Sequence, residues 1–240
     1  AVDLRTDTVA TVAGTGAQAR RRSPGGPARE VSLNSPWDLL WKDGLLYVAM
    51  AGWHQIWRLH PDEARVEVWA GSGAEELHDA SLEMAAMAQP SGLTTDGKRA
   101  YFADPEASAI RWASEGEGTE TLVGTGLFDF GDRDGVGDEV RLQHALGVAW
   151  WGKKQTLLVA DTYNHRIKMV VPATREARSF AGTGEPGSGD GTASVASFWE
   201  PGGLAISPDE RHVFVADTNN HRLRVIDLAV GRVGTVALGE

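Results

Sequence analysis

The chain has 240 residues, of which 42% are hydrophobic and 23% are charged, the composition of a soluble globular domain with enough apolar material for a core. It carries 23 Lys and Arg against 33 Asp and Glu, and a formal net charge of −10 disfavours nucleic acid as a partner. The absence of cysteine excludes disulfides, thiolate metal sites and thiol redox chemistry within this sequence.

The sequence contains no membrane or export signal that we can identify. It has no run of about 18 apolar residues, so we expect no membrane-spanning helix and no membrane partner. The first residues, Ala1–Asp7, lack the pattern of a signal peptide, which favours a cytoplasmic location. The one dense basic run, Arg20–Arg22, is typical of a solvated loop and not of a binding patch.

A repeat of about 56 residues organises the chain. A short glycine string follows an apolar run at five places, the last of them the degraded string Val236–Gly239. The first four strings begin at Gly14, Gly71, Gly124 and Gly182, which lie 57, 53 and 58 residues apart. Such a period indicates stacked supersecondary units, each too small to bury its own apolar face.

Each repeat begins with a segment resembling Pro-x-Gly-Leu, such as Pro201–Leu204, and continues through a short turn into an apolar strand. Three further strands follow by the same alternation, and no segment has a sustained helical period. We therefore predict strands c and d of a preceding blade, and then four complete four-stranded repeats, with these boundaries: 1–14, 15–71, 72–124, 125–182 and 183–240.

The clearest part of each repeat is an apolar run, a polar turn and a second run, as in His212–Leu228. It recurs at Leu157–Lys168 and in weaker form at Ala103–Arg111 and Ala49–Trp57. This pattern predicts two antiparallel strands joined by a tight turn in which Asn takes the left-handed conformation.

Four short strands per repeat predict an all-β fold, a β-propeller whose blades stack face to face around an axis. The small residues at the starts of the first strands, Gly92, Gly147 and Gly203, suit the crowded inner strand. Large aromatic side chains are expected to fill the layers between blades. The tryptophans expected there are Trp37, Trp41, Trp57, Trp69, Trp112, Trp150 and Trp151.

Two segments, Asp161–Ile167 and Asp217–Leu223, resemble the NHL repeat. The Asp-Gly loops at Asp134 and Asp190 are similar as well. Further strings, among them Ser35–Leu39, resemble a branch of the family with bacterial members, in which a six-bladed propeller follows a thioredoxin-like domain. The resemblance implies NHL-type blades in a longer protein, although the redox cysteines of that domain are not in this sequence.

Histidines and carboxylates are the candidate metal ligands. His54, His165 and His221 occupy the same place in different repeats, so they should lie on different blades, too far apart to share a zinc ion. The loop Asp129–Gly135 lacks the spaced carboxylates of a calcium loop. We expect no metal and no cofactor.

In three repeats, though not at Met50 in the first, the second strand ends on an aspartate, and these aspartates are expected to satisfy N–H groups of the turn that follows. They are Asp104, Asp161 and Asp217.

The favoured function is a non-catalytic scaffold that binds a protein or peptide on the rim formed by the b–c turns and the d–a loops. Exposed aromatic and histidine side chains of that rim would make the contacts, unless they merely pack the loops. The candidates are Trp53, His54, Phe128, Phe130, Tyr163, His165, Trp199 and His221.

Two other functions compete with the scaffold. A metal-dependent hydrolase or lyase would need an axial site at the channel mouth, where Asp38 is the lone carboxylate at the inner-strand starts. An RNA-binding rim would need a positive surface, which the acidic balance disfavours.

The N-terminal segment aligns with the C-terminal one, Ala1–Thr15 with Val225–Gly239. We expect either that the chain is part of a longer polypeptide or that residues 1–14 dock on the last blade in place of 225–239. In the first case an uncovered blade face would favour self-association.

Overall fold

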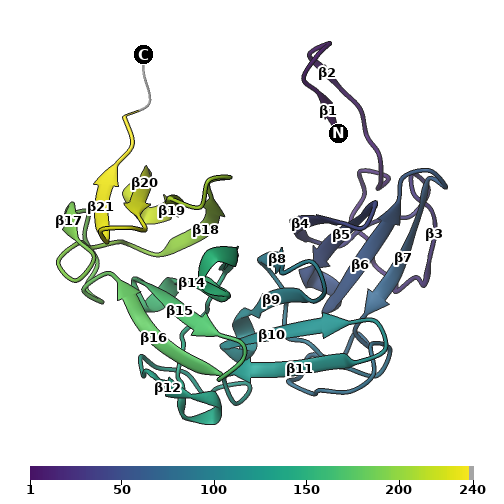
Figure 1. The fold of residues 1–240 in the computed structure, drawn as a ribbon. Coiled ribbons are helices and arrows are strands. Elements are labelled where there is room, and N and C mark those ends of the chain that lie inside the picture. The colour runs from purple at the N-terminus through teal and green to yellow at the C-terminus, as the bar shows by residue number, and fades with distance from the viewer. Residues whose placement is uncertain (238–240) are drawn as a thin grey trace.

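The computed structural model describes residues 1–237, and four antiparallel sheets follow one another along the chain in an open arc (Figure 1). A two-stranded hairpin of β1 (Val2–Asp3) and β2 (Thr8–Val9) lies beyond the first sheet. No helix in the described part of the chain has the length and apolarity needed to cross a membrane. The fold is all-β, as predicted.

Each sheet is a meander of four strands, here called blades 1 to 4 and strands a to d. Blade 1 contains β4 (Pro36–Lys42), β5 (Leu45–Met50), β6 (Gln55–His60) and β7 (Arg65–Ala70). Blade 2 contains β8 (Leu93–Thr95), β9 (Ala100–Asp104), β10 (Ala109–Ser114) and β11 (Gly118–Val123). Blade 3 contains β13 (Gly147–Trp151), β14 (Thr156–Asp161), β15 (Arg166–Val171) and β16 (Glu176–Ala181). Blade 4 contains β18 (Pro201–Ile206), β19 (His212–Asp217), β20 (Arg222–Asp227) and β21 (Arg232–Thr235).

A short strand from the d–a loop extends three of the blades. It pairs with strand d, so the outer edge of the sheet is covered by the blade's own loop. These strands are β3 (Gly25–Pro27) in blade 1, β12 (Gly135–Val136) in blade 3 and β17 (Gly191–Thr192) in blade 4.

The b–c turn of every blade is a single 3₁₀ turn followed by one left-handed residue. The turns are η1 (Ala51–Trp53), η2 (Pro105–Ala107), η5 (Thr162–Asn164) and η6 (Thr218–Asn220), while η3 (Gly137–Glu139) and η4 (Gly152–Lys154) lie elsewhere. The left-handed residue is His in three blades, as at His165 with φ 53°, and Ser108 with φ 46° in blade 2. The prediction that Asn takes this position is wrong, because Asn164 lies within the 3₁₀ turn.

Apolar layers between consecutive blades form the core. Tyr47 and Phe102 pack between blades 1 and 2, Ile110 and Leu157 between blades 2 and 3, and Ile167 with its neighbours between blades 3 and 4. All five side chains are less than 5% exposed. Burial of a side chain of this size contributes about 1.5–3 kcal/mol, so the blade interfaces are a main source of stability.

The tryptophans fill these layers only in part. Trp69, Trp112 and Trp151 are buried in them, and the half-buried Trp150 stacks on Tyr101. Trp57 is also buried, but on the face of blade 1 turned away from blade 2, where Ala28 and Val31 of the preceding loop cover it.

The prediction is wrong for Trp37 and Trp41, which are 51% and 62% exposed. Alternation along β4 explains the error, because Leu40 packs against blade 2 while the odd-numbered residues point to the opposite face. No other blade of residues 1–237 covers that face.

The inner strands approach one another so closely that glycine is required at two positions. A Cβ atom at Gly147 would lie 2.2 Å from the carbonyl oxygen of Gly202. One at Gly92 would lie 2.6 Å from that of Leu146. Asp38 holds the equivalent place in blade 1, where its Oδ2 accepts a hydrogen bond from the N–H of Leu93 at 2.7 Å.

The N-terminal segment does not take the place of the C-terminal strands in blade 4. The hairpin β1–β2 lies beside blade 1, at the end of the arc far from blade 4 (Figure 1). Strand β20 pairs with β21 of its own blade, so the predicted docking of residues 1–14 on blade 4 is wrong. Leu238 and Gly239 of the string Val236–Gly239 lie outside the described residues.

Candidate functional site

A buried ion pair anchors blades 2 and 4. Strand b ends on an aspartate, and strand c carries an arginine seven residues later. Asp104 and Arg111 are 2.8 Å apart, Asp217 and Arg224 are 2.7 Å apart, and all four side chains are fully buried. A second aspartate from the d–a loop, Asp79 or Asp190, completes each cluster. The carboxylates thus satisfy a charge that burial would otherwise leave unpaired.

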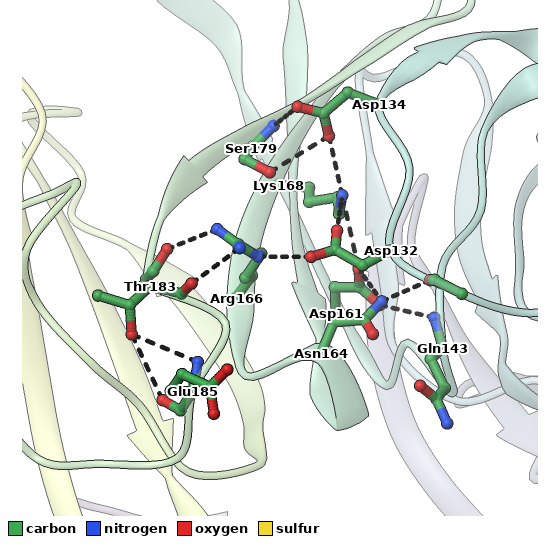
Figure 2. Close-up of polar contacts among 12 residues, drawn as sticks. Asp132, Asp134, Gln143, Asp161, Asn164, Arg166, Lys168, Ser179, Thr183 and Glu185 are labelled. Carbon is green, nitrogen blue, oxygen red and sulfur yellow. Dashed lines mark hydrogen bonds and ion pairs between the residues drawn. The ribbon is translucent and has the colours of Figure 1, made fainter.

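Blade 3 has the same arrangement with a lysine (Figure 2). Lys168 Nζ lies 2.6 Å from Asp132 and 2.8 Å from Asp134, and 3.9 Å from Asp161. The Oδ1 atom of Asp161 accepts a hydrogen bond from the N–H of Gln143. Burial raises the pKa of Asp161 to about 7. The positive charge of Lys168 offsets this only in part, because its ammonium group lies nearer to two other carboxylates.

These contacts fasten the d–a loop of blade 3 to its sheet. Asp134 also accepts a hydrogen bond from the N–H of Ser179, and Arg166 joins Asp132 to the carbonyl oxygens of Gly182 and Thr183 (Figure 2). The prediction that the strand-end aspartates cap the turn that follows them is wrong, because none of them accepts a hydrogen bond from the N–H groups of that turn. Each instead accepts one from a backbone N–H just before the inner strand of its own blade. The ion pairs themselves are not in the prediction, although the spacing of seven between acid and base recurs in three repeats.

The loop 129–135 keeps its carboxylates occupied. Arg141 binds Asp129 at 2.6 Å, while Lys168 and Arg166 hold the other two aspartates named above. Among residues 1–237, no three His, Asp or Glu side chains are grouped so that they could hold a metal ion.

A pocket opens on the rim between blades 2 and 3. Its volume is about 360 Å³. Four segments supply its walls: the b–c turns of both blades, the d–a loop before blade 3, and one residue of the loop before blade 2. The residues that line it are Glu75, Pro105, Glu106, Ser108, Leu127, Phe128, Phe130, Gln143, His144 and Tyr163.

Aromatic rings dominate this rim pocket. His144 and Tyr163 stack with their ring centroids 4.6 Å apart and their planes 10° from parallel. Phe128 is 91% exposed and Phe130 58%, so these two rings lie mostly in solvent, whereas Tyr163, 46% exposed, packs against His144 of the loop. Exposed aromatic groups of this kind are typical anchors of protein interfaces.

The charged side chains that line the rim pocket are both acidic, Glu75 and Glu106. His144 Nδ1 lies 3.7 Å from a carboxylate oxygen of Glu106. Burial lowers the pKa of His144 from its usual 6.5, so the imidazole is neutral at pH 7 and leaves Glu106 uncompensated.

Three of the eight candidate residues converge in the rim pocket: Phe128, Phe130 and Tyr163. The others lie elsewhere. His165 accepts a hydrogen bond from the N–H of Glu200 at 3.1 Å, and the N–H of Trp199 is held by Asp217. The remaining candidates lie on blades 1 and 4, at the ends of η1 and η6: Trp53, His54 and His221.

Sequence reasoning missed His144, Glu75 and Glu106. Loop length could have pointed to the junction where they lie, although not to these three residues. From the last glycine of the glycine string to the clamping aspartate there are eight residue steps in blade 3 (Gly126 to Asp134). The same stretch has six steps before blade 2 (Gly73 to Asp79) and six before blade 4 (Gly184 to Asp190). The extra length carries Phe128 and Phe130.

Equivalent positions in the other blades carry no aromatic side chain. Tyr163 is the middle residue of its 3₁₀ turn, and its counterparts are Gly52, Glu106 and Asn219. The left-handed residue His144 has as counterparts Ser35, Gln89 and Glu200, all with φ between 52° and 65°. The fold itself therefore does not require aromatic rings at these two positions.

The central hollow is lined by the starts of the inner strands and has a volume of about 440 Å³. Asp38 is its one carboxylate among the described residues, and both its oxygens accept backbone hydrogen bonds, from Leu39 and Leu93. Burial raises the pKa of Asp38. This lining offers no set of side chains for the axial hydrolase or lyase site considered from the sequence.

Residues 198–226 match the model of the NHL repeat. NHL repeat-containing protein 2 of Bos taurus is 41% identical over 258 residues, which cover 95% of this chain and 36% of that protein. Protein SUPPRESSOR OF QUENCHING 1, chloroplastic, of Arabidopsis thaliana is 41% identical over 242 residues, which cover 96% of this chain and 23% of that protein. The chain thus spans about a third of the length of the first of these relatives.

A chain in the crystal structure of the nidogen/laminin complex has a TM-score of 0.61 with 14% identity, covering 86% of this chain and 65% of that one. At this identity the likeness shows the fold alone. The named relatives are from an animal and a plant and give no support to a bacterial origin. The chain is built of NHL-type β-propeller blades and resembles NHL repeat-containing protein 2 over 95% of its length.

Proposed function

We propose that this chain is a non-catalytic scaffold that binds a protein or peptide, and that the rim pocket between blades 2 and 3 is its binding site. One observation carries the proposal. Phe128, Phe130, His144 and Tyr163 gather at one blade junction, beside a loop two residues longer than the loops before blades 2 and 4, at positions that the repeat does not need for folding. In repeat proteins such insertions commonly lie on the binding face.

The size of the rim pocket favours part of a polypeptide as its occupant. A volume of about 360 Å³ is at the small end of ligand sites, and it holds one or two side chains of a peptide. Phe128 and Phe130 project from the surface and can close over such a segment. Rigid aromatic rings lose little conformational entropy on binding, which is why they recur as anchors.

The clamp around Lys168 supports the same function. It holds the loop directly after the two phenylalanines, through Asp132 and Asp134, and again at Gln143, just before the inner strand (Figure 2). A loop fixed in this way presents its aromatic side chains without first having to order its backbone.

Selection from a random peptide library displayed on phage tests the proposal. The full chain is the bait, and the rim variant carries Phe128→Ser, Phe130→Ser and Tyr163→Ser. A matched control carries three exposed apolar substitutions outside the pocket, Met84→Ser, Val195→Ser and Val230→Ser.

We expect the enriched peptides to bind the control as well as they bind the unmodified chain, and the rim variant at least about tenfold more weakly. Thermal unfolding must show that both variants are folded. Peptides that bind the rim variant with unchanged affinity, or a selection that enriches none, would contradict the proposal.

A further inference from the structure

We infer that the rim pocket takes a cationic side chain, arginine or lysine, of a basic peptide segment. This inference rests on the proposed function and names the chemistry of its ligand. Its basis is the combination of carboxylates and aromatic rings around one small cavity, since this combination recognises organic cations.

The carboxylates come from two different loops of blade 2. Glu106 is the middle residue of η2, and its side chain is 41% exposed. Glu75 lies in the loop before blade 2, where Gln89 Nε2 donates a hydrogen bond to it at 3.3 Å. Neither carboxylate has a lysine or arginine within salt-bridge distance among residues 1–237. Both can therefore accept hydrogen bonds from a bound cation.

The basic side chains near the pocket are held by other acids. Arg141 binds Asp129, and Lys168 binds the aspartates of the loop. His144, the one imidazole in the lining, is kept neutral by burial. The negative charge of Glu75 and Glu106 thus stands without an internal counter-ion.

The rings supply the second half of the recognition. An ammonium or guanidinium group is attracted to the face of an aromatic ring, and the energy rises when the group is partly removed from water. Phe128, Phe130 and the stacked pair His144–Tyr163 border the cavity from two segments, the d–a loop before blade 3 and the b–c turn of blade 3. An anionic ligand such as a phosphopeptide would meet two carboxylates and no lysine or arginine, so we reject it.

The blade 3–4 junction provides an internal comparison. Asn219 stands there in the place of Tyr163, and Glu200 in the place of His144. Its loop lacks the two extra residues. Trp199, 43% exposed, is an aromatic side chain at this junction, but among the described residues it has no stacked partner, and its loop carries no exposed phenylalanine. This junction should therefore bind a cationic peptide more weakly than the rim pocket does, because exposed ion pairs contribute little by themselves.

Fluorescence polarisation with three short peptides tests the inference. One contains repeated Gly-Arg-Leu units, and in the others Gln or Glu replaces every Arg. The unmodified chain is compared with two pocket variants, Phe128→Ala and Glu106→Gln. The controls are Val230→Ala in the c–d turn of blade 4 and Asn219→Ala at the blade 3–4 junction.

We expect the Arg peptide to bind at least about tenfold more tightly than the Gln peptide and the Glu peptide to bind most weakly. Phe128→Ala and Glu106→Gln should each weaken the Arg peptide by about threefold to tenfold, and the controls should not. Added salt should weaken the Arg peptide more than the Gln peptide.

Equal binding of the Arg and Gln peptides, or no effect of Glu106→Gln, would overturn the cation inference. If library peptides still required Phe128 in that case, the rim scaffold itself would stand. Failure of every peptide, including those from the library, would overturn the proposed function.

Discussion

The polar cluster inside the blades and the rim pocket between blades 2 and 3 are built by opposite rules. The cluster recurs with the repeat, as Asp104–Arg111, Asp217–Arg224 and its lysine version in blade 3. The pocket occurs at one junction, and its rings stand where other blades carry Gly, Ser, Asn, Gln or Glu. In a repeat protein, what recurs maintains the fold, and what occurs once is free to serve a partner.

Blade 1 shows that even the recurring cluster has a substitute. Met50 and Trp57 take the places of the aspartate and the base, and both are fully buried. An apolar pair can thus replace a buried ion pair, as is found when such pairs are exchanged for well-packed hydrophobic groups. Removal of only one partner should be strongly destabilising, because it leaves the other charge buried away from water without its partner.

The largest effect should follow from breaking the repeated cluster. Asp217→Ala leaves Arg224 buried, with Asp190 as its remaining carboxylate, and should lower the free energy of unfolding by about 3–5 kcal/mol. Urea denaturation measures the change. The double variant Asp217→Met with Arg224→Trp copies blade 1 and should recover part of the loss. A single variant within about 1 kcal/mol of the unmodified chain would show that the cluster is dispensable.

Blade 3 should respond differently, because the pKa of Asp161 is raised to about 7 from 3.8. The folded state then binds the proton more tightly than the unfolded state does. The contribution of Asp161 to stability is fully present below about pH 4 and is lost as the pH rises to about 7.

Asp161→Asn cannot titrate, so its stability relative to the unmodified chain should rise across this range, by up to about 4 kcal/mol. Urea midpoints at pH 4, 5, 6 and 7 measure the difference. Parallel pH profiles of the two proteins would contradict the raised pKa of Asp161.

Gly147 and Gly203 occupy the same position of the repeat but have different surroundings. A Cβ atom at Gly147 would meet the carbonyl oxygen of Gly202, whereas nothing lies within 4 Å of one at Gly203. Gly147→Ala should therefore cost about 1–3 kcal/mol in the free energy of unfolding. Gly203→Ala should change it by less than about 0.5 kcal/mol. Equal costs would mean that the inner strands are not held as closely as the structure shows.

The smallest effect on stability is expected on the rim. Phe128→Ala removes a ring that is 91% exposed, so the free energy of unfolding should change by less than about 0.5 kcal/mol. Calorimetry checks this value. A loss above about 1.5 kcal/mol would mean that Phe128 packs the fold after all.

The fold follows from the sequence because its signals are local and repeated. Strand alternation and the glycine strings predict the four-stranded blades. Residues at equivalent positions of the second strand, such as Tyr47 and Tyr101, are buried in the structure. The errors arise where one blade differs from the pattern. Trp37 and Trp41 belong to an inner strand whose outward face has no neighbour in the described chain, and their size alone gave no sign of it.

The candidate site was predictable only in part, because it depends on contacts between loops from different repeats. Phe128 and Tyr163 are recognisable as exposed aromatics, but Glu75 and Glu106 reach the same cavity from the neighbouring blade. Only the stacking of blades brings these side chains together. Self-association through an uncovered blade face stays a prediction, for which Phe214, 36% exposed on blade 4, is the side chain to examine.

We propose that the rim pocket binds a peptide and that the blades fold without it. A loop exchange tests both halves: Leu127–Phe130 is replaced by Glu-Pro, the pair that fills the corresponding place in blade 4 as Glu185 and Pro186. We predict that the free energy of unfolding stays within about 1 kcal/mol and that the affinity for library-selected peptides falls at least about tenfold. A folded exchange variant that binds those peptides as tightly as before would contradict the account.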